Sequence, residues 1–288
     1  MNPEDGIQSY YDVFGADDAP RTLLFLPTWS LVHSRCWKMQ VPYFARRGFR
    51  VVTFDGRGNG KSERPASGYT AEHYAGDALA VCAAAGVDTF ALVALSAGGR
   101  PAVALAAGHP ERVEQLVLIA PAIRIDGGAR LELDAFLSTP PDREGWNKYN
   151  AVHWRENYRD FTEWFAGQIF SEPHSTKPID DFVSWASETT GETLIATTLE
   201  SAAPRAREWC QATRCPTLLL HGEMDRIIPL ENSLRIQAEI PDCELAVIEG
   251  GGHAPNARDP VMVNLMIHEF LDRASPYRLK METAYARA

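Results

Sequence analysis

Short apolar runs alternate with longer stretches of helical spacing through the first part of the chain. Each run has the length of a strand and is continuously hydrophobic, which is typical of a strand buried on both faces. Strand and helix in alternation predict a mostly parallel central sheet with helices on both faces, an α/β fold. We expect strands at residues 22–26, 50–55, 90–95 and 113–120, with helices near 35–47, 71–86 and 97–108.

The same alternation resumes near residue 213. A strand at 216–220, a helix near 230–239, a strand at 243–248 and a helix near 258–273 complete the expected sheet. The last fifteen residues are polar and are expected to form a short tail. Residues 1–121 and 213–288 are therefore predicted to make up one α/β core.

Residues 122–212 interrupt this pattern. The stretch contains no run that predicts a strand, and it holds five of the chain's seven tryptophans, including Trp154 and Trp164. We expect a mainly helical cap, or lid, inserted between two strands of the sheet. Its aromatic residues could simply be the apolar faces by which helices dock. We expect a few of them to line a pocket, because a cap over a sheet encloses space for a ligand.

Charge and composition narrow the classes of partner. The formal net charge is −10, which disfavours binding to nucleic acid or to anionic membrane surfaces. The first ten residues do not resemble a signal peptide, and no apolar run is long enough to span a membrane. We therefore expect a cytoplasmic protein whose partner is a small-molecule substrate. The sequence leaves open whether the chain forms a homo-oligomer.

Cysteine and histidine spacing gives no support for a metal or a disulfide framework. The five cysteines are odd in number and fit neither a zinc site nor a redox pair. We expect reduced thiols, no metal site and no cofactor.

The stretch Val93-Ala-Leu-Ser-Ala-Gly-Gly99 leaves an expected strand and enters an expected helix. Ser96 would lie at the tip of that turn, with small residues on either side so that neighbouring chains can approach. The turn also places the backbone N–H of Ala97 where developing negative charge is favoured. A serine in such a turn could be structural, so the turn alone leaves both interpretations open.

A nucleophilic serine needs a base, and His253 is the best candidate for that base among the eight histidines. It lies in a glycine-rich loop after the last expected strand, at the sheet edge where ligands bind in open α/β folds. His221 ends a strand and is more typical of a structural imidazole. Asp225, in the loop after the strand at 216–220, is the candidate that orients His253, and Glu223 is the alternative. The order serine, acid, histidine is the one that this kind of fold uses.

With these motifs, the chain resembles the α/β-hydrolase superfamily over nearly its full length. Two further stretches carry the resemblance, Phe54-Asp-Gly-Arg-Gly-Asn-Gly-Lys-Ser62 and His109-Pro-Glu-Arg-Val113. It is similar to the branch that includes serine esterases, enol-lactone hydrolases, C–C hydrolases and cofactor-free haloperoxidases. The resemblance implies Ser96, Asp225 and His253 as the catalytic triad. Members usually carry His-Gly before the second oxyanion donor, whereas this chain has Pro27-Thr-Trp29.

By position, the resemblance implies that the backbone N–H of Trp29 completes an oxyanion hole with that of Ala97. We expect the substrate pocket to include four further side chains, each of which could instead be simple packing. They are His33, Trp37, Trp154 and Trp164.

Gly58-Asn-Gly-Lys-Ser62 resembles the end of a phosphate-binding loop. Asp55 stands where the first glycine of that motif is required, so the stretch does not predict an ATP site. We expect its glycines to form a tight loop that supports the turn at Ser96.

Together these features predict a hydrolase that cleaves a small, moderately apolar ester or lactone, with a cyclic or aromatic substrate as one expectation. Two alternatives remain open from the sequence. The same three residues could serve a C–C hydrolase, a lyase or a cofactor-free oxygenase. The fold also includes non-catalytic ligand-binding proteins, since fold alone does not dictate function.

Overall fold

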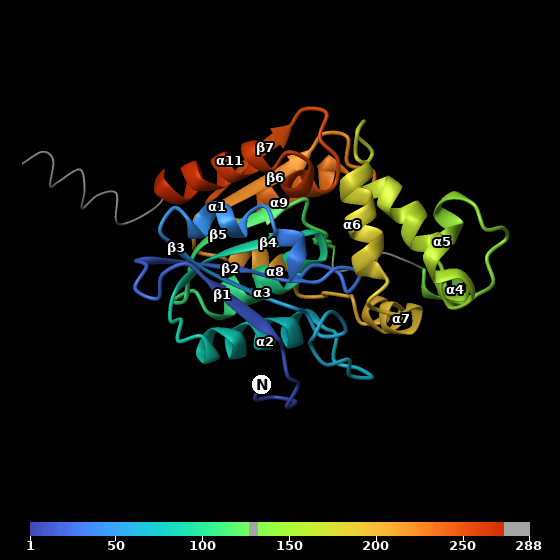
Figure 1. The fold of residues 1–288 in the computed structure, drawn as a ribbon, viewed down its shortest axis with the longest axis horizontal. Coiled ribbons are helices and arrows are strands. Elements are labelled where there is room, and N and C mark those ends of the chain that lie inside the picture. The colour runs from blue at the N-terminus through green and yellow to red at the C-terminus, as the bar shows by residue number, and fades with distance from the viewer. Residues whose placement is uncertain (127–131, 274–288) are drawn as a thin grey trace, which may run out of the picture.

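The computed structural model describes residues 1–126 and 132–273. The tail expected at the end of the chain lies outside these residues. A seven-stranded sheet with the order β1-β3-β2-β4-β5-β6-β7 forms the centre of the molecule (Figure 1). All neighbouring pairs are parallel except β1 and β3. The strands are β1 Tyr11–Phe14, β2 Arg21–Phe25, β3 Phe49–Phe54, β4 Phe90–Leu95, β5 Val113–Ile119, β6 Thr217–Gly222 and β7 Cys243–Ile248.

The mostly parallel sheet predicted from the sequence is confirmed, and six of its strands lie within two residues of their expected ends. β1 was not predicted. It is four residues long and only half-buried at the edge of the sheet, so it has no continuous apolar run to reveal it. Its pairing with β3, which places Tyr11 opposite Phe54, is a tertiary contact that local sequence does not encode.

Two hydrophobic clusters fill the two faces of the sheet. Successive residues of β2 point to opposite faces, so Leu23 belongs to one cluster and Leu24 to the other. The face of Leu24 is covered by α2, α3, α8 and α9, and the face of Leu23 by α1 and α11. These helices are α1 Val41–Ala45, α2 Ala71–Ala84, α3 Gly99–Gly108, α8 Ala206–Ala212, α9 Leu230–Glu239 and α11 Pro260–Arg273.

Several expected helices begin with short 3₁₀ or α-helical turns. The predicted helix at 35–47 is divided into the 3₁₀ helix η1 (Ser34–Trp37) and α1. The helix after Ser96 begins as the 3₁₀ helix η2 (Ser96–Gly98) and continues as α3. The last predicted helix is preceded by the short α10 (Pro255–Arg258).

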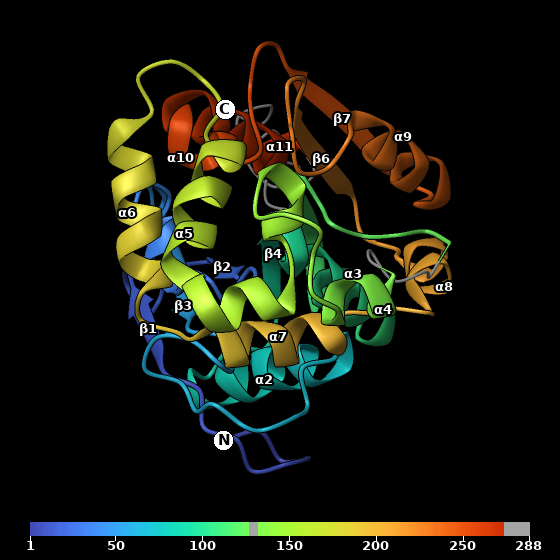
Figure 2. The ribbon, with the colours of Figure 1, turned by 90° about the vertical axis from the view of Figure 1, so that its right-hand side faces the viewer.

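The segment between β5 and β6 is helical where it is described and lies over the carboxyl ends of the strands (Figure 2). α8 falls within the expected cap range 122–212, but it packs in the same cluster as α3, against the sheet. The part that covers the strand ends therefore runs from α4 to α7, and we call it the cap. Its elements are α4 Leu133–Leu137, the 3₁₀ helix η3 Gly145–Lys148, α5 Ala151–Ile169, α6 Thr176–Ala186 and α7 Gly191–Leu199.

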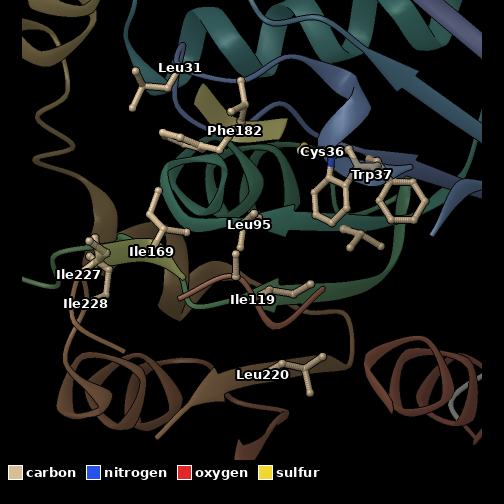
Figure 3. Close-up of a cluster of buried hydrophobic side chains, with 14 of the residues drawn as sticks. Leu31, Cys36, Trp37, Leu95, Ile119, Ile169, Phe182, Leu220, Ile227 and Ile228 are labelled. Atoms are coloured by element: carbon tan, nitrogen blue, oxygen red, sulfur yellow. The ribbon is translucent and has the colours of Figure 1, made fainter. Parts of the chain in front are cut away.

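The first cluster continues without a break from the sheet into the cap. Leu95, Ile119 and Leu220, near the ends of three parallel strands, are followed by Ile169 and Phe182 of the cap (Figure 3). The cap is therefore fixed to the sheet by shared apolar packing. Within the described ranges, no helix combines the length and hydropathy that crossing a membrane requires.

Candidate active site

Ser96 occupies the sharp turn between β4 and η2. Its backbone has φ 51°, a left-handed conformation that costs a non-glycine residue about 1–3 kcal/mol. The surrounding structure holds this turn in place, and the Ala122 N–H donates to the Ser96 carbonyl at 2.9 Å. A Cβ on Gly98 would lie 2.6 Å from the Pro27 carbonyl oxygen. Glycine is therefore required at position 98 by the close approach of two backbones.

Three side chains from three separate loops form one hydrogen-bonded chain. His253 Nε2 lies 2.9 Å from Ser96 Oγ. His253 Nδ1 lies 2.7 Å from Asp225 Oδ2. Ser96 follows β4, Asp225 follows β6 and His253 follows β7, so the parallel strands bring all three to one edge of the sheet. The structure thus brings together the three residues that the sequence predicted.

The second oxygen of Asp225 is also occupied. Asp225 Oδ1 accepts the backbone N–H groups of Ile227 and Ile228 at 2.7 and 3.0 Å. Burial by itself raises the pKa of this carboxyl, but the charge of His253 and these N–H donors outweigh it and lower the net pKa. Asp225 is therefore held as a carboxylate that can orient the His253 ring and stabilise its protonated form.

The other candidates in this region have different partners. Glu223 is exposed, and its carboxylate accepts the Gly250 N–H at 3.1 Å, so it does not contact His253. His221 is fully buried, with Nε2 donating to the Ile228 carbonyl at 2.9 Å and Nδ1 accepting from Ser233 Oγ at 2.7 Å. It is the structural imidazole expected from its position.

Trp29 and Ala97, the two predicted oxyanion donors, border the same cavity as Ser96 and His253. Ala97 lies in η2 directly after Ser96. Trp29 lies two residues after Pro27, whose carbonyl contacts the turn at Gly98. The loop that carries Trp29 is thereby packed against the loop that carries Ser96. This arrangement can present two backbone N–H groups to one oxygen next to Ser96.

The glycine-rich loop after β3 supports the Trp29 loop. Asn59 Nδ2 donates to the Ser30 carbonyl at 2.5 Å, and the Asp55 carboxylate accepts the Ser34 N–H at 3.0 Å. Gly60 has φ 52°, and a Cβ there would lie 2.2 Å from Asp55 Oδ2. A Cβ on Gly58 would instead lie closest to Thr193 and Tyr69, so support of the turn at Ser96 by these glycines stays a prediction.

A cavity of about 470 Å³ opens above Ser96. On the side of α6 its wall is apolar and mostly buried. Elsewhere the wall includes exposed charged residues such as Arg124, which follows β5, and Glu231 of α9. The cavity therefore has an apolar inner part and a polar mouth. The inner wall is formed mainly by Trp29, Leu31, Val32, Tyr149, Phe165, Ile169, Phe182 and Trp185.

The four further side chains predicted for the pocket are absent from its wall, so that prediction is corrected. Trp37 is fully buried and donates to the Leu26 carbonyl at 3.0 Å, and Trp154 donates to the Lys148 carbonyl at 2.9 Å. These indoles are satisfied core groups. His33 caps η1, and Trp164 packs edge-on against Trp146 with ring centroids 5.1 Å apart.

Sequence reasoning missed the cap residues that do line the cavity. Phe182 and Trp185 are three residues apart in α6, and Phe165 and Ile169 are four apart in α5. These spacings place each pair on one face of its helix. The spacing was visible in the sequence, but which face meets the cavity depends on how the helices dock.

Comparison with known proteins agrees with the fold. Residues 21–260 match the family model described as alpha/beta hydrolase fold, and the chain belongs to this family. A bifunctional esterase/perhydrolase of Acinetobacter calcoaceticus is 28% identical over 249 residues, which cover 83% of this chain and 87% of the relative. A non-heme haloperoxidase of Rhodococcus erythropolis is 26% identical over 284 residues, which cover 94% of this chain and 98% of the relative.

Solved structures show the same fold. An esterase from Exiguobacterium antarcticum superposes with a TM-score of 0.79 at 19% identity, covering 94% of this chain and 98% of the esterase. An enol-lactonase from Burkholderia xenovorans superposes with a TM-score of 0.78 at 21% identity, covering 93% of this chain and 97% of the lactonase. The family and the 28% identical esterase/perhydrolase support hydrolase activity for the chain.

Proposed function

We propose that this protein is a serine hydrolase that cleaves the ester bond of a small, moderately apolar carboxylic ester or lactone through an acyl-enzyme. The observation that carries the proposal is the unbroken hydrogen-bonded chain from Ser96 through His253 to Asp225 at the floor of the cavity. A serine hydroxyl becomes a nucleophile when an adjacent base removes its proton, and a third group keeps the base oriented.

In the proposed reaction, Ser96 Oγ bonds to the substrate carbonyl carbon while His253 Nε2 takes the hydroxyl proton. The carbonyl oxygen becomes an oxyanion and accepts the backbone N–H groups of Trp29 and Ala97. The C–O bond to the leaving alcohol then breaks, and His253 returns the proton to that oxygen. Water then attacks the acyl carbon while His253 takes a proton from it. The bond between that carbon and Ser96 Oγ breaks, His253 returns the proton to Ser96 Oγ, and the acid is freed.

The shape of the cavity supports the proposed substrate class. Its volume of about 470 Å³ suits a small molecule, and its inner wall is largely aromatic and aliphatic. We place the apolar part of the ester or lactone there, against Phe165, Phe182 and Trp185. The names of the relatives, an esterase/perhydrolase and an enol-lactonase, are consistent with this class of bond.

The test is a panel of aryl esters, alkyl esters and lactones assayed with the wild-type protein and with Ser96→Ala. We expect an initial burst of alcohol from activated esters in the wild type, and a loss of kcat of about 10⁴-fold or more in the variant. A fluorophosphonate should label the wild-type serine and leave Ser96→Ala unlabelled.

Two results would contradict the proposal. Serine labelling without a burst or turnover on any ester or lactone would favour a C–C hydrolase, a lyase or an oxygenase. Tight ligand binding with no turnover of any substrate would favour a binding protein.

A further inference from the structure

The loop that carries Trp29 is anchored to the core on both sides of that residue. Before it, the Pro27 carbonyl contacts the turn at Gly98. After it, the Ser30 carbonyl accepts from Asn59 Nδ2 at 2.5 Å, and Ser30 Oγ lies 3.2 Å from the Tyr74 hydroxyl. These contacts fix the residues that flank Trp29 and leave its side chain to be held by other elements.

The cap holds that side chain. The indole stacks on Tyr149 with ring centroids 5.6 Å apart and planes 18° apart, and it meets Phe165 edge-on, also at 5.6 Å. Trp29 Nε1 donates to Thr197 Oγ1 of α7 at 3.1 Å. Thr197 uses its own hydroxyl hydrogen to donate to the Leu194 carbonyl at 2.9 Å, so its oxygen is the acceptor for the indole. Thr197 is 5% exposed, so the acceptor side of this bond is buried.

We infer that Trp29 is a positioning residue through which the cap sets the geometry of the oxyanion hole, and that Thr197 is the group that fixes it. The inference rests on the proposed function, in which the backbone N–H of Trp29 binds the oxyanion. The indole held by the cap and the N–H assigned to the oxyanion in the proposed function belong to the same residue. A change in the position of the ring therefore changes the direction of the donor.

The consequence is catalytic because oxyanion donors act through precise placement. A misplacement of about 1 Å can cost about 10²-fold in rate. An oxyanion is present only in the transition state and the tetrahedral intermediate, so a misdirected donor should lower kcat and leave ground-state binding nearly unchanged. Substitution of a side chain that only packs in the cap would instead change the free energy of unfolding. It would not lower kcat selectively while KM stays the same.

The central experiment compares Thr197→Val with Thr162→Val. Both threonines are buried in cap helices, and each donates its hydroxyl to the carbonyl three residues earlier at 2.9 Å. Only Thr197 accepts from Trp29. We expect Thr197→Val to lower kcat about 10-fold on an activated ester, with KM changed by less than about two-fold. Thr162→Val should retain wild-type kcat.

Two further variants test the same bond from both ends. Thr197→Ser keeps a hydroxyl and should restore most of the kcat. Trp29→Phe keeps an aromatic ring but removes the indole donor, and it should lower kcat by an amount similar to that of Thr197→Val. The double variant should be no slower than the slower single variant, because both substitutions remove one interaction.

Binding measurements complete the test. A trifluoromethyl ketone that forms a tetrahedral adduct with Ser96 should bind about 10-fold more weakly to Thr197→Val, whereas the product acid should bind as it does to the wild type. Equal kcat in Thr197→Val and Thr162→Val, in a wild type that does hydrolyse esters, would overturn the inference and leave the proposed function standing. A wild type with no ester or lactone turnover would instead contradict the proposed function.

Discussion

Asp225 lies between two histidines that differ in their hydrogen-bond partners. His253 Nδ1 is 2.7 Å from Asp225 Oδ2, and its Nε2 faces Ser96. His221 Nε2 is 3.4 Å from the same carboxylate oxygen, but both of its ring nitrogens already have short bonds to Ile228 and Ser233. Burial lowers the pKa of His221, against smaller opposing contributions from Ile228 and Asp225. His221 therefore stays neutral and rigid, and His253 is the imidazole free to move a proton.

The lowered pKa of His221 gives the protein a pH-dependent stability. An unfolded chain binds a proton at this histidine near its ordinary pKa of 6.5, before the folded protein does. The free energy of unfolding contributed by neutral His221 is therefore complete above pH 6.5 and decreases as the pH falls through the lower, folded pKa. We expect urea titrations between about pH 8 and 5 to show this decrease in the wild type and a shallower one in His221→Gln. Parallel curves for the two proteins would contradict this origin.

At the scale of elements, the turn from β4 into α3 depends on both local sequence and a distant backbone. The strand, the small residues and the helix around Ser96 form one local pattern, so the sequence was sufficient to predict the turn. The reason for glycine at position 98 is tertiary, because the Pro27 carbonyl of the neighbouring loop lies 2.6 Å from where a Cβ would be. One substitution there should disturb both the Ser96 turn and the Trp29 loop.

We expect Gly98→Ala to lower both stability and activity. The added methyl group must displace backbone, which typically costs about 1–3 kcal/mol of unfolding free energy. The same shift would move the two predicted oxyanion donors apart, so kcat should fall by at least about 10-fold. Gly108→Ala is the matched control, since Gly108 ends the same helix and its added Cβ would meet nothing within 4 Å. The control should be neutral or slightly stabilising, and equal effects at both positions would contradict the explanation.

At the scale of the whole molecule, the sequence was informative about the core and less so about the cap. Buried parallel strands and the loops that follow them have strong local patterns, so six strands and the meeting of Ser96, Asp225 and His253 could be predicted. The edge strand β1 and the cavity wall could not, because both depend on which surfaces meet after folding. Trp154 and Phe182 are both aromatic residues of cap helices, yet the first is a core residue and the second lines the cavity.

The cap and the core also meet at the loop that carries His253. Glu172, just after α5, accepts the Gly252 N–H at 2.7 Å, and the Ile169 carbonyl accepts the His253 N–H at 3.2 Å. The cap therefore holds two successive backbone N–H groups of this loop, those of Gly252 and His253. Glu172→Ala removes one of these anchors and leaves the Gly252 N–H unpaired, which typically costs about 1–3 kcal/mol. We expect this loss in urea denaturation, together with a decrease in kcat of about 10-fold.

Glu172→Gln and Glu163→Ala separate this anchor from a general effect of altering the cap. Glu172→Gln keeps a carbonyl oxygen that can accept the Gly252 N–H, so its kcat should stay within about two-fold of the wild type. Glu163 lies on α5 and pairs with exposed Arg159, and its removal should change stability by less than about 0.5 kcal/mol. A loss of activity in Glu163→Ala equal to that in Glu172→Ala would show that the cap responds as a whole. A loss confined to Glu172→Ala would place the coupling between the cap and His253, the proposed catalytic base, at the Gly252 hydrogen bond.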